Sequence, residues 1–454
     1  MDGLKKAGEF EWEVPVEGEM KVPGKIFASE SLIGQVDRES VSQIRDVACL
    51  PGILGASLAM PDLHRGYGFC IGGVGAFDID EGVICPGGVG YDINCSVRLI
   101  ASNLMEKDIV GREKEIVSAL KRRISSGVGG RGISLSGEEL DGVLRKGALW
   151  AVENGFGNLK DLERIEDGGV LDCADVGAVS EVAKKRGLSQ LGTLGGGNHF
   201  LDVLVVDEVF DECVAEKFGL KKGQVVVMIH CGSRGLGHQV ASDYIKEMGG
   251  KGLVGVPFKS EVGQRYFGAM CAAANFAFAN KQVIACEVED ELRKFFPDLE
   301  MDIVYEVCHN IAKVERHGGR DVLVMRKGAT RAFGAGRVEV CEDYRDVGQP
   351  VLLPGSMGTF SYVLVGGGRK DAWESCSHGA GRAMSRKEAS DRVDFGEAVC
   401  GMERRGVFVE GGKRGMIEEA PSSYKDIEEV VGVCEGVGLG RRVVGLRPRM
   451  VVIG

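Results

Sequence analysis

The chain has 454 residues, of which 44% are hydrophobic, and it carries a formal net charge of −11. This composition is typical of a globular protein with a large core, and it excludes collagen-like and linker-like chains even though glycine is abundant. The acidic balance argues mildly against a nucleic-acid partner, but net charge is a poor description of a local patch.

The first 19 residues are charged and lack the apolar region of a signal peptide, and the longest apolar runs are too short to span a bilayer. We therefore expect a cytoplasmic protein, or a nuclear one in a eukaryotic cell, with no membrane partner. The 14 cysteines include no CxxC pair, so we expect most of them to be buried thiols. Cys95 is the exception because of its neighbours.

Hydrophobic periodicity and turn residues predict helices and strands that alternate along the chain. In the first half we expect a helix at 40–47, short strands and turns at 55–100, and helices at 109–124, 139–153 and 179–185. Helices dominate residues 107–187, which we expect to form a helix-rich subdomain. In the second half we expect strands at 200–206, 224–229, 322–325, 351–354, 362–365 and 450–453, and helices at 238–247, 263–295 and 424–434. The mixture indicates an α/β or α+β protein with helices on both sides of its sheets.

Five side chains form a set of metal-ligand types. Asp92 and Cys95 lie three residues apart behind a glycine-rich turn, while His199, His230 and His309 stand beside glycine or asparagine residues or at a strand end. Carboxylate, thiolate and imidazole together suit Zn, Mn or Co. We therefore expect two cations that share the thiolate, an arrangement common in phosphoryl transfer. For each histidine alone, a hydrogen-bonded core role stays the alternative.

His378 lies in the segment 377–382, where small residues predict a turn that opens a helix. A helix N-terminus favours phosphate, Arg382 adds a cation, and a histidine can act as a covalent nucleophile. A histidine that caps a helix is the alternative. The loops 354–359 and 366–368 could bind a nucleotide through main-chain groups, or could be plain turns. The sequence has no P-loop and no clean dinucleotide-binding fingerprint.

Several long motifs resemble those of the RtcB-type RNA ligases, in order from about residue 40 to the C-terminus. They are Pro61-Asp62-Leu63-His64, the segment from Gly87 to Cys95, Gly196-Gly197-Asn198-His199-Phe200, the segment from His230 to Gly235, the segment from His309 to Lys313, the segment from Arg326 to Arg331, Pro354-Gly355-Ser356-Met357, the segment from His378 to Arg382, and Glu419-Ala420-Pro421.

This resemblance implies a GTP- and Mn-dependent RNA ligase that joins a 2′,3′-cyclic phosphate or 3′-phosphate end to a 5′-hydroxyl end, in tRNA splicing or RNA repair. It implies a single compact α+β domain over residues 1–454, with mixed sheets flanked by helices around a deep cleft for two metals, where length alone would favour two or three domains. RNA, in the form of tRNA halves, and the activator archease are the implied partners.

The resemblance also assigns roles to residues. His378 would take GMP from GTP as a phosphoramidate. Asp92, Cys95 and His199 would hold one Mn²⁺, and Cys95 would bridge to a second held by His230 and His309. The implied nucleotide site comprises Asn198, Asp202, His309, Asn310, Pro354, Gly355, Ser356, Met357, Ser361, His378, Gly379, Ala380 and Gly381, and the implied RNA phosphate contacts are Arg234 and Arg382.

The chain departs from the family pattern at two positions. Asp202 stands where the family usually has Glu, and Ile453 precedes the final glycine where the family commonly has Lys. Loss of that cation would remove one nucleotide contact, on the order of 1–3 kcal/mol. Two alternatives stay open: a phosphohydrolase with two metals that acts on RNA or nucleotide ends, and a weakly active RNA-binding member of the family.

Overall fold

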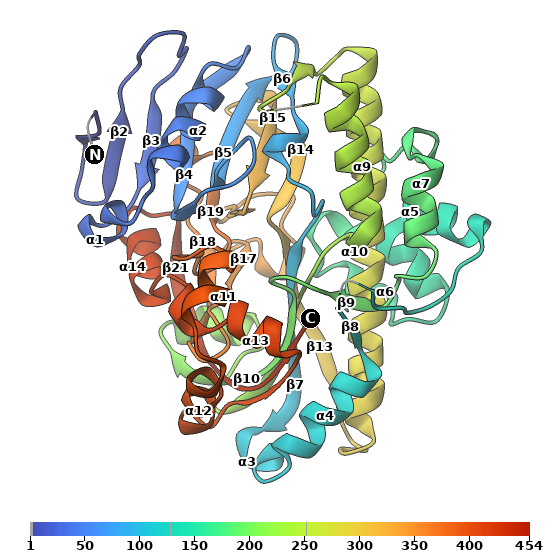
Figure 1. Cartoon of the computed structure of the whole chain (residues 1–454). Coiled ribbons are helices and arrows are strands. Elements are labelled where there is room, and N and C mark those ends of the chain that lie inside the picture. Colours follow the sequence, from blue (N-terminus) through green and yellow to red (C-terminus); the bar gives the residue numbers. More distant parts are fainter. Residues whose placement is uncertain (1–2, 128, 251) are drawn as a thin grey trace.

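The computed structural model describes residues 3–127, 129–250 and 252–454, which form two large sheets surrounded by helices (Figure 1). The first sheet has seven strands in the order β1 (Lys5–Lys6), β2 (Glu11–Val14), β3 (Gly24–Phe27), β4 (Ile53–His64), β5 (Ile71–Asp78), β15 (Arg320–Lys327) and β14 (Asn310–His317). Its neighbouring strands are antiparallel except for β3 and β4, which run parallel.

The second sheet has eight strands. Seven follow the order β13 (Met301–Cys308), β7 (Ser96–Met105), β11 (Gln224–Cys231), β10 (Phe200–Val209), β21 (Gly440–Ile453), β18 (Ser361–Gly366) and β17 (Pro350–Leu353), all antiparallel, and β20 (Phe408–Glu410) pairs with β21 in parallel. Three ribbons join β6 (Val83–Ile84) to β12 (Val256–Pro257), β16 (Ala329–Arg331) to β19 (Ser375–Ser377), and β8 (Ser125–Ser126) to β9 (Thr193–Gly195).

The helices begin mostly at polar caps; Ser260, for example, accepts a hydrogen bond from the Gly263 amide at the start of α10. In chain order the α-helices are α1 (Glu30–Gly34), α2 (Arg38–Ala48), α3 (Glu106–Ile109), α4 (Glu113–Arg123), α5 (Gly137–Glu153), α6 (Leu159–Leu162), α7 (Glu181–Gly187), α8 (Glu212–Lys217), α9 (Arg234–Glu247), α10 (Glu261–Arg293), α11 (Arg386–Arg392), α12 (Phe395–Arg404), α13 (Lys413–Glu418) and α14 (Ile427–Gly436). Short 3₁₀ helices are η1 (Pro86–Gly88), η2 (Glu166–Gly169), η3 (Val176–Ala178), η4 (Glu342–Tyr344), η5 (Lys370–Ala372) and η6 (Pro421–Ser423).

The helix α10 organises one flank of the molecule. It runs beside α9, with α5 and α7 outside the pair (Figure 1). Its residues 268–285 are buried and share a hydrophobic cluster with α5, α9 and the ends of strands from the first sheet. Within the described residues, neither α10 nor any other helix has the long unbroken apolar stretch needed to cross a bilayer. The division of the chain into one domain with a helix-rich part at 107–187 stays a prediction.

Most predicted elements are confirmed, and the differences have physical causes. The helix expected at 109–124 begins later, at Glu113 of α4, because Gly111 adopts a φ of +83° between α3 and α4. The helix expected at 424–434 begins at Ile427, because the Asp426 side chain caps it. The strand expected at 450–453 is the end of the much longer β21, whose arginines pair with acids: Arg447 contacts Asp207 at 2.9 Å.

The helix expected to open at His378 is not found, and this prediction is wrong. The chain turns through Gly381, whose φ is +74°, and Arg382 pairs with Tyr424 in an isolated bridge. The next helix, α11, begins at Arg386, after the Ser385 cap. No helix N-terminus therefore lies at His378 to bind a phosphate.

A buried ion cluster ties α10 to the second sheet. Glu306 on β13 accepts contacts from Arg98 on β7 at 2.6 Å and from Lys281 on α10 at 3.2 Å, and all three side chains are 0% exposed. The Ser96 hydroxyl donates to the same carboxylate at 3.0 Å, and Arg98 also donates to Gln282 at 2.6 Å. The carboxylate thus compensates two cations that water cannot reach.

Replacement of Glu306 with alanine is expected to destabilise the fold by about 3–5 kcal/mol, because it leaves two buried cations without a counter-charge. Denaturant unfolding of the parent and the variant measures the difference. Glu153→Ala, which removes the half-exposed partner of Lys146, is the matched control and should change the midpoint little. Equal stability of the Glu306 variant and the parent would contradict this account.

Candidate functional site

Strand register brings the predicted ligands to one edge of the second sheet. Ser96, the first residue of β7, lies opposite Cys231 of β11 and Cys308 of β13, so the adjacent Cys95, His230 and His309 meet. Phe200 of β10 lies opposite His230, which places the preceding His199 at the same edge. The chain leaves the second sheet after β13 and enters the first at β14, so His309 lies where the two sheets meet.

The turn that carries Asp92 and Cys95 is fixed from three sides. Asn94 adopts a left-handed φ of +52°, and its amide side chain donates to the Ala274 carbonyl on α10 at 3.0 Å. Its backbone N–H donates to the Asn310 carbonyl at 2.7 Å, while the His309 N–H donates to the Cys95 carbonyl at 3.0 Å. These bonds hold both ligand loops in one orientation.

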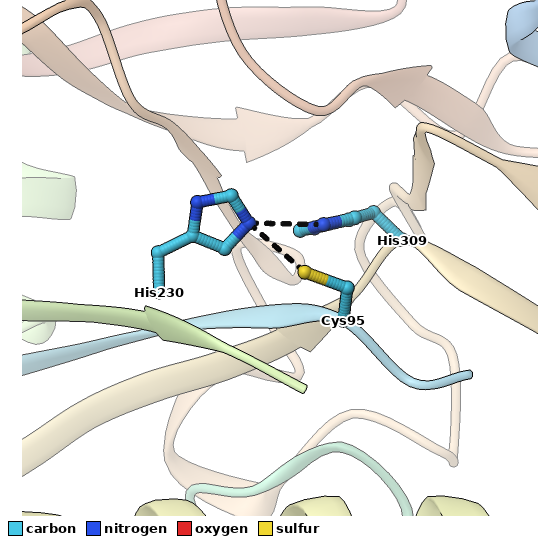
Figure 2. Close-up of side chains that lie close together, drawn as sticks. All are labelled: Cys95, His230 and His309. Carbon is cyan, nitrogen blue, oxygen red and sulfur yellow. Dashed lines mark hydrogen bonds between the residues drawn. The ribbon is translucent and has the colours of Figure 1, made fainter. Parts of the chain in front are cut away.

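The ligand atoms converge on the Cys95 sulfur. His230 Nε2 lies 3.2 Å from Cys95 Sγ and 3.2 Å from His309 Nε2 (Figure 2). On the other side, His199 Nε2 lies 3.5 Å from the sulfur and 2.7 Å from Asp92 Oδ2. Two groups of three ligand atoms result, and they share Cys95; within each group all atoms lie within 4.8 Å of one another.

The electrostatics of this cluster favour a cation. Burial lowers the pKa of His230 and of His309 well below the usual value, and the neighbouring imidazoles act in the same direction. Burial and the Asp92 charge raise the pKa of the Cys95 thiol. Burial opposes ionisation of Asp92, but His199 outweighs it, so the pKa of this carboxyl is lowered. A neutral imidazole carries a lone pair on one ring nitrogen, so His230 and His309 can both act as ligands of a divalent ion beside the Cys95 sulfur.

Unpartnered and closely packed atoms support the same conclusion. Within the described part of the chain, Asp92 Oδ1 is buried and has no hydrogen-bond partner, which a bound ion would supply. A Cβ on Gly232 would lie 2.4 Å from that oxygen. The glycine thus leaves room for the carboxylate beside the ligand cluster. The residues present fit two divalent cations that share a thiolate.

His378 lies beside this cluster, held by an acid to which sequence analysis gave no role. Its ring centroid is 5.0 Å from that of His309. Asp62 Oδ2 accepts from both the His378 backbone N–H, at 3.0 Å, and the ring Nδ1, at 2.5 Å. Burial disfavours the Asp62 carboxylate, but the His378 contacts outweigh it and lower its pKa. The sequence contained one signal of this role: Asp62 is an isolated acid within the largely apolar strand β4, and a buried carboxylate requires a partner.

The cluster opens into a cavity of about 590 Å³ with a basic rim. Arg186, Arg234, Arg382 and Arg386 line it, together with His238 and Tyr91. Arg234 donates to Thr193 and Gly127, whereas Arg382 is bound by Met384, Glu418 and Glu419 and packs over the Tyr424 ring. Arg386 has a side chain 45% exposed, and sequence analysis had not singled it out as a contact.

Five of the predicted nucleotide residues, Asn198, Asp202, Gly355, Ser356 and Met357, line a narrow pocket of about 20 Å³ next to the cavity. It is lined by Asn198, His199, Phe200, Asp202, Gly355, Ser356, Met357, Glu419, Tyr424, Val451 and Ile453. Burial raises the pKa of Asp202 well above its usual range, and its Oδ1 has no hydrogen-bond partner among the described residues. Both departures from the family pattern, Asp202 and Ile453, therefore lie in this one pocket.

Other predicted nucleotide residues have structural contacts of their own. The Asn310 side chain donates to the Asp92 carbonyl at 3.2 Å and accepts from the Gly328 amide at 2.9 Å, so it supports the metal-ligand turn. Asn198 accepts from the Tyr424 hydroxyl at 2.9 Å, and Ser361 accepts from the Gly355 amide at 3.0 Å. The turn from Gly379 to Gly381 packs between the Pro354 carbonyl and Asp62.

The family model and the curated relatives that match this chain all carry the same family name. A family model described as "tRNA-splicing ligase RtcB" matches residues 43–454. Curated relatives include "tRNA-splicing ligase RtcB" of Thermococcus kodakarensis, 49% identical over 99% of this chain and 99% of that protein, and its namesake in Archaeoglobus fulgidus, 46% identical over the full length of both. "RNA-splicing ligase RtcB homolog 1" of Entamoeba dispar is 43% identical over 100% of this chain and 91% of that protein.

Removal of the shared ligand is expected to cost both cations, whereas removal of an unshared one should cost one. Equilibrium dialysis against Mn²⁺ followed by elemental analysis should give two ions per chain for the parent, about one for His199→Ala, and none or a small fraction for Cys95→Ala. Cys213→Ala, which removes an exposed cysteine, is the matched control and should retain two. Two tightly bound ions in the Cys95 variant would contradict the shared site.

Proposed function

The chain belongs to the RtcB family, and on that premise we propose that it is an RNA ligase that joins a 2′,3′-cyclic phosphate or 3′-phosphate end to a 5′-hydroxyl end. Split tRNA is the substrate class that the names of the relatives favour. The observation that carries the proposed chemistry is the contact of Asp62 with His378, directly beside the ligand cluster.

The contact with Asp62 prepares His378 as a nucleophile. Because the ring Nδ1 donates a hydrogen bond to the buried carboxylate, Nε2 is the nitrogen left to act as the nucleophile. Attack of Nε2 on the α-phosphate of GTP forms a P–N bond and breaks the bond to the β-phosphate oxygen, so pyrophosphate leaves. The ring becomes positively charged in this step, and the Asp62 carboxylate stabilises that charge.

Asp92, Cys95 and His199 would hold one cation, and Cys95, His230 and His309 the other. Two divalent ions bound there would neutralise phosphate charge and orient the reacting groups. The 5.0 Å between the His309 and His378 rings supports this arrangement, because it leaves the nucleophile adjacent to one of the ligand groups. We propose Mn²⁺ as the ion, and GTP as the nucleotide.

The base would lie at the mouth of the narrow pocket, inside the larger cavity, because about 20 Å³ holds little more than a water molecule. The buried Asp202 carboxyl of this pocket lacks a partner among the described residues, and the N–H donors of guanine would supply one. Ile453 offers an apolar contact to the ring in place of a charge. GMP would pass from His378 to the RNA 3′-phosphate, and attack by the 5′-hydroxyl would then release it. Arg234 and the exposed Arg386 are cations suited to the RNA phosphates. Arg382, already bound within the protein, would contact RNA at the cavity wall.

Incubation with α-labelled GTP and Mn²⁺ should produce a labelled band on a denaturing gel, because the nucleotide becomes covalently bound. The label should be acid-labile, as a phosphoramidate is, and absent from His378→Ala and Cys95→Ala. The labelled parent should then join an RNA with a 3′-phosphate to one with a 5′-hydroxyl. Joining is measured by the appearance of the longer RNA.

The variant Asp62→Asn separates two effects of Asp62: the orientation of the His378 ring and the negative charge beside it. It retains an acceptor for Nδ1 but loses the charge, so the single-turnover labelling rate should fall by about 10²–10⁴-fold while nucleotide binding changes little. Asp80→Asn, at an exposed acid, is the matched control and should label at the parent rate. RNA-end hydrolysis by a parent that acquires no label would favour the phosphohydrolase and contradict the ligase.

A further inference from the structure

Two cysteines far apart in the sequence lie in contact at the surface of α10. Cys173 and Cys271, 98 positions apart, have their sulfur atoms 2.7 Å from each other. Cys173 is exposed, whereas Cys271 is 1% exposed on the face of α10. We propose that Cys173 and Cys271 are a modification site: they form a reversible disulfide that locks the segment 171–178 onto α10.

The backbone around the pair is already fixed in the geometry that such a bond needs. On one side of Cys173, the Leu171 amide donates to the Asn275 side chain at 2.8 Å, and the Asn275 amide group donates back to the Leu171 carbonyl at 3.2 Å. On the other side, the Asp175 amide donates to the Gly268 carbonyl at 3.0 Å. Cys173 is therefore held between two anchors, opposite the α10 turn that carries Cys271.

A glycine permits this close approach. A Cβ on Gly268 would lie 2.7 Å from the Asp175 Cβ, so a side chain there would push the segment away from α10. The S–S bond can form with small side-chain movements, because the two anchors already hold the backbone segments together.

The two thiols differ in a way that suits stepwise oxidation. The hydrogen bond from Cys271 lowers the pKa of Cys173, while burial raises the pKa of Cys271. The exposed thiolate of Cys173 attacks one sulfur of a disulfide oxidant, whose S–S bond breaks and releases one thiol. The Cys271 thiol loses its proton to solvent and attacks the Cys173 sulfur; the protein S–S bond forms and the second thiol leaves. Two protein thiols are oxidised, and one oxidant disulfide is reduced.

The disulfide would act at a distance from the metal ligands. Ala274 and Asn275, one turn beyond Cys271 on α10, contact Asn94 and Leu171. The cross-link therefore stabilises the part of α10 that supports the Asp92–Cys95 turn, and the buried Cys95 stays reduced. Because the bond closes a loop of about a hundred residues, it should raise Tm by at least about 3 °C.

A dipyridyl disulfide tests the proposal on the intact, folded chain by counting the coloured thione that it releases. An isolated exposed cysteine releases one thione and keeps a pyridyl adduct, whereas the pair should release two and keep none. Cys173→Ser should therefore lower the thione yield by two equivalents, and the matched control Cys213→Ser by one. Cys271→Ser should lower it by one and leave an adduct on Cys173.

Two further measurements complete the test: peptide mapping in the absence of reductant, and thermal unfolding. The oxidised parent should contain a peptide pair linked through positions 173 and 271, and its Tm should fall back on reduction; Cys173→Ser should show neither effect. A pyridyl adduct retained on Cys173 in the parent, with Cys271 still open to alkylation after denaturation, would overturn the proposal.

Discussion

The antiparallel registers of β7, β11 and β13 fix the positions of Cys95, His230 and His309, and the rest of the site depends on that alignment. A shift by one residue in any of these pairings would turn a ligand to the opposite face of the sheet. The buried Glu306 cluster resists such a shift, because one carboxylate holds side chains from β7 and α10 together. Fold stability and site geometry are thus connected through β7 and β13, which belong to both.

Charge balance explains why the site has two neighbouring parts, the ligand cluster and the Asp62–His378 pair. The ligand cluster gathers neutral bases and two acidic groups at a buried edge, so its electrostatics are completed by cations. Next to it, the buried Asp62 carboxylate accepts from one ring nitrogen of His378, and the proposed chemistry uses the other nitrogen. The cavity then joins a basic rim, suited to a polyanion, to a narrow pocket that contains an unpaired acid. An acidic net charge is compatible with this local arrangement.

Sequence analysis could predict that the five candidate ligands lie together, because carboxylate, thiolate and imidazole groups in glycine-rich turns have few other uses in combination. It could predict most helices and strands because their hydrophobic periodicity is strong. It gave Asp62 no role, because the partner of a buried acid depends on tertiary contacts between β4 and the turn at His378. The helix expected at His378 was wrong for a related reason: small residues indicated a helix start, whereas they permit close packing against Asp62 and Pro354. The Cys173–Cys271 contact joins residues 98 positions apart, so the sequence around either cysteine does not indicate it.

The most direct test of the account is a crystal structure with Mn²⁺ and a GTP analogue whose α–β bridge cannot be cleaved, with anomalous scattering recorded at the manganese edge. The account predicts two anomalous peaks within bonding distance of Cys95 Sγ, one beside Asp92 and His199 and the other beside His230 and His309. It also predicts that His378 Nε2 faces the α-phosphate, with Nδ1 still on Asp62. A single peak remote from Cys95, or a nucleotide whose α-phosphate lies out of reach of His378, would contradict it.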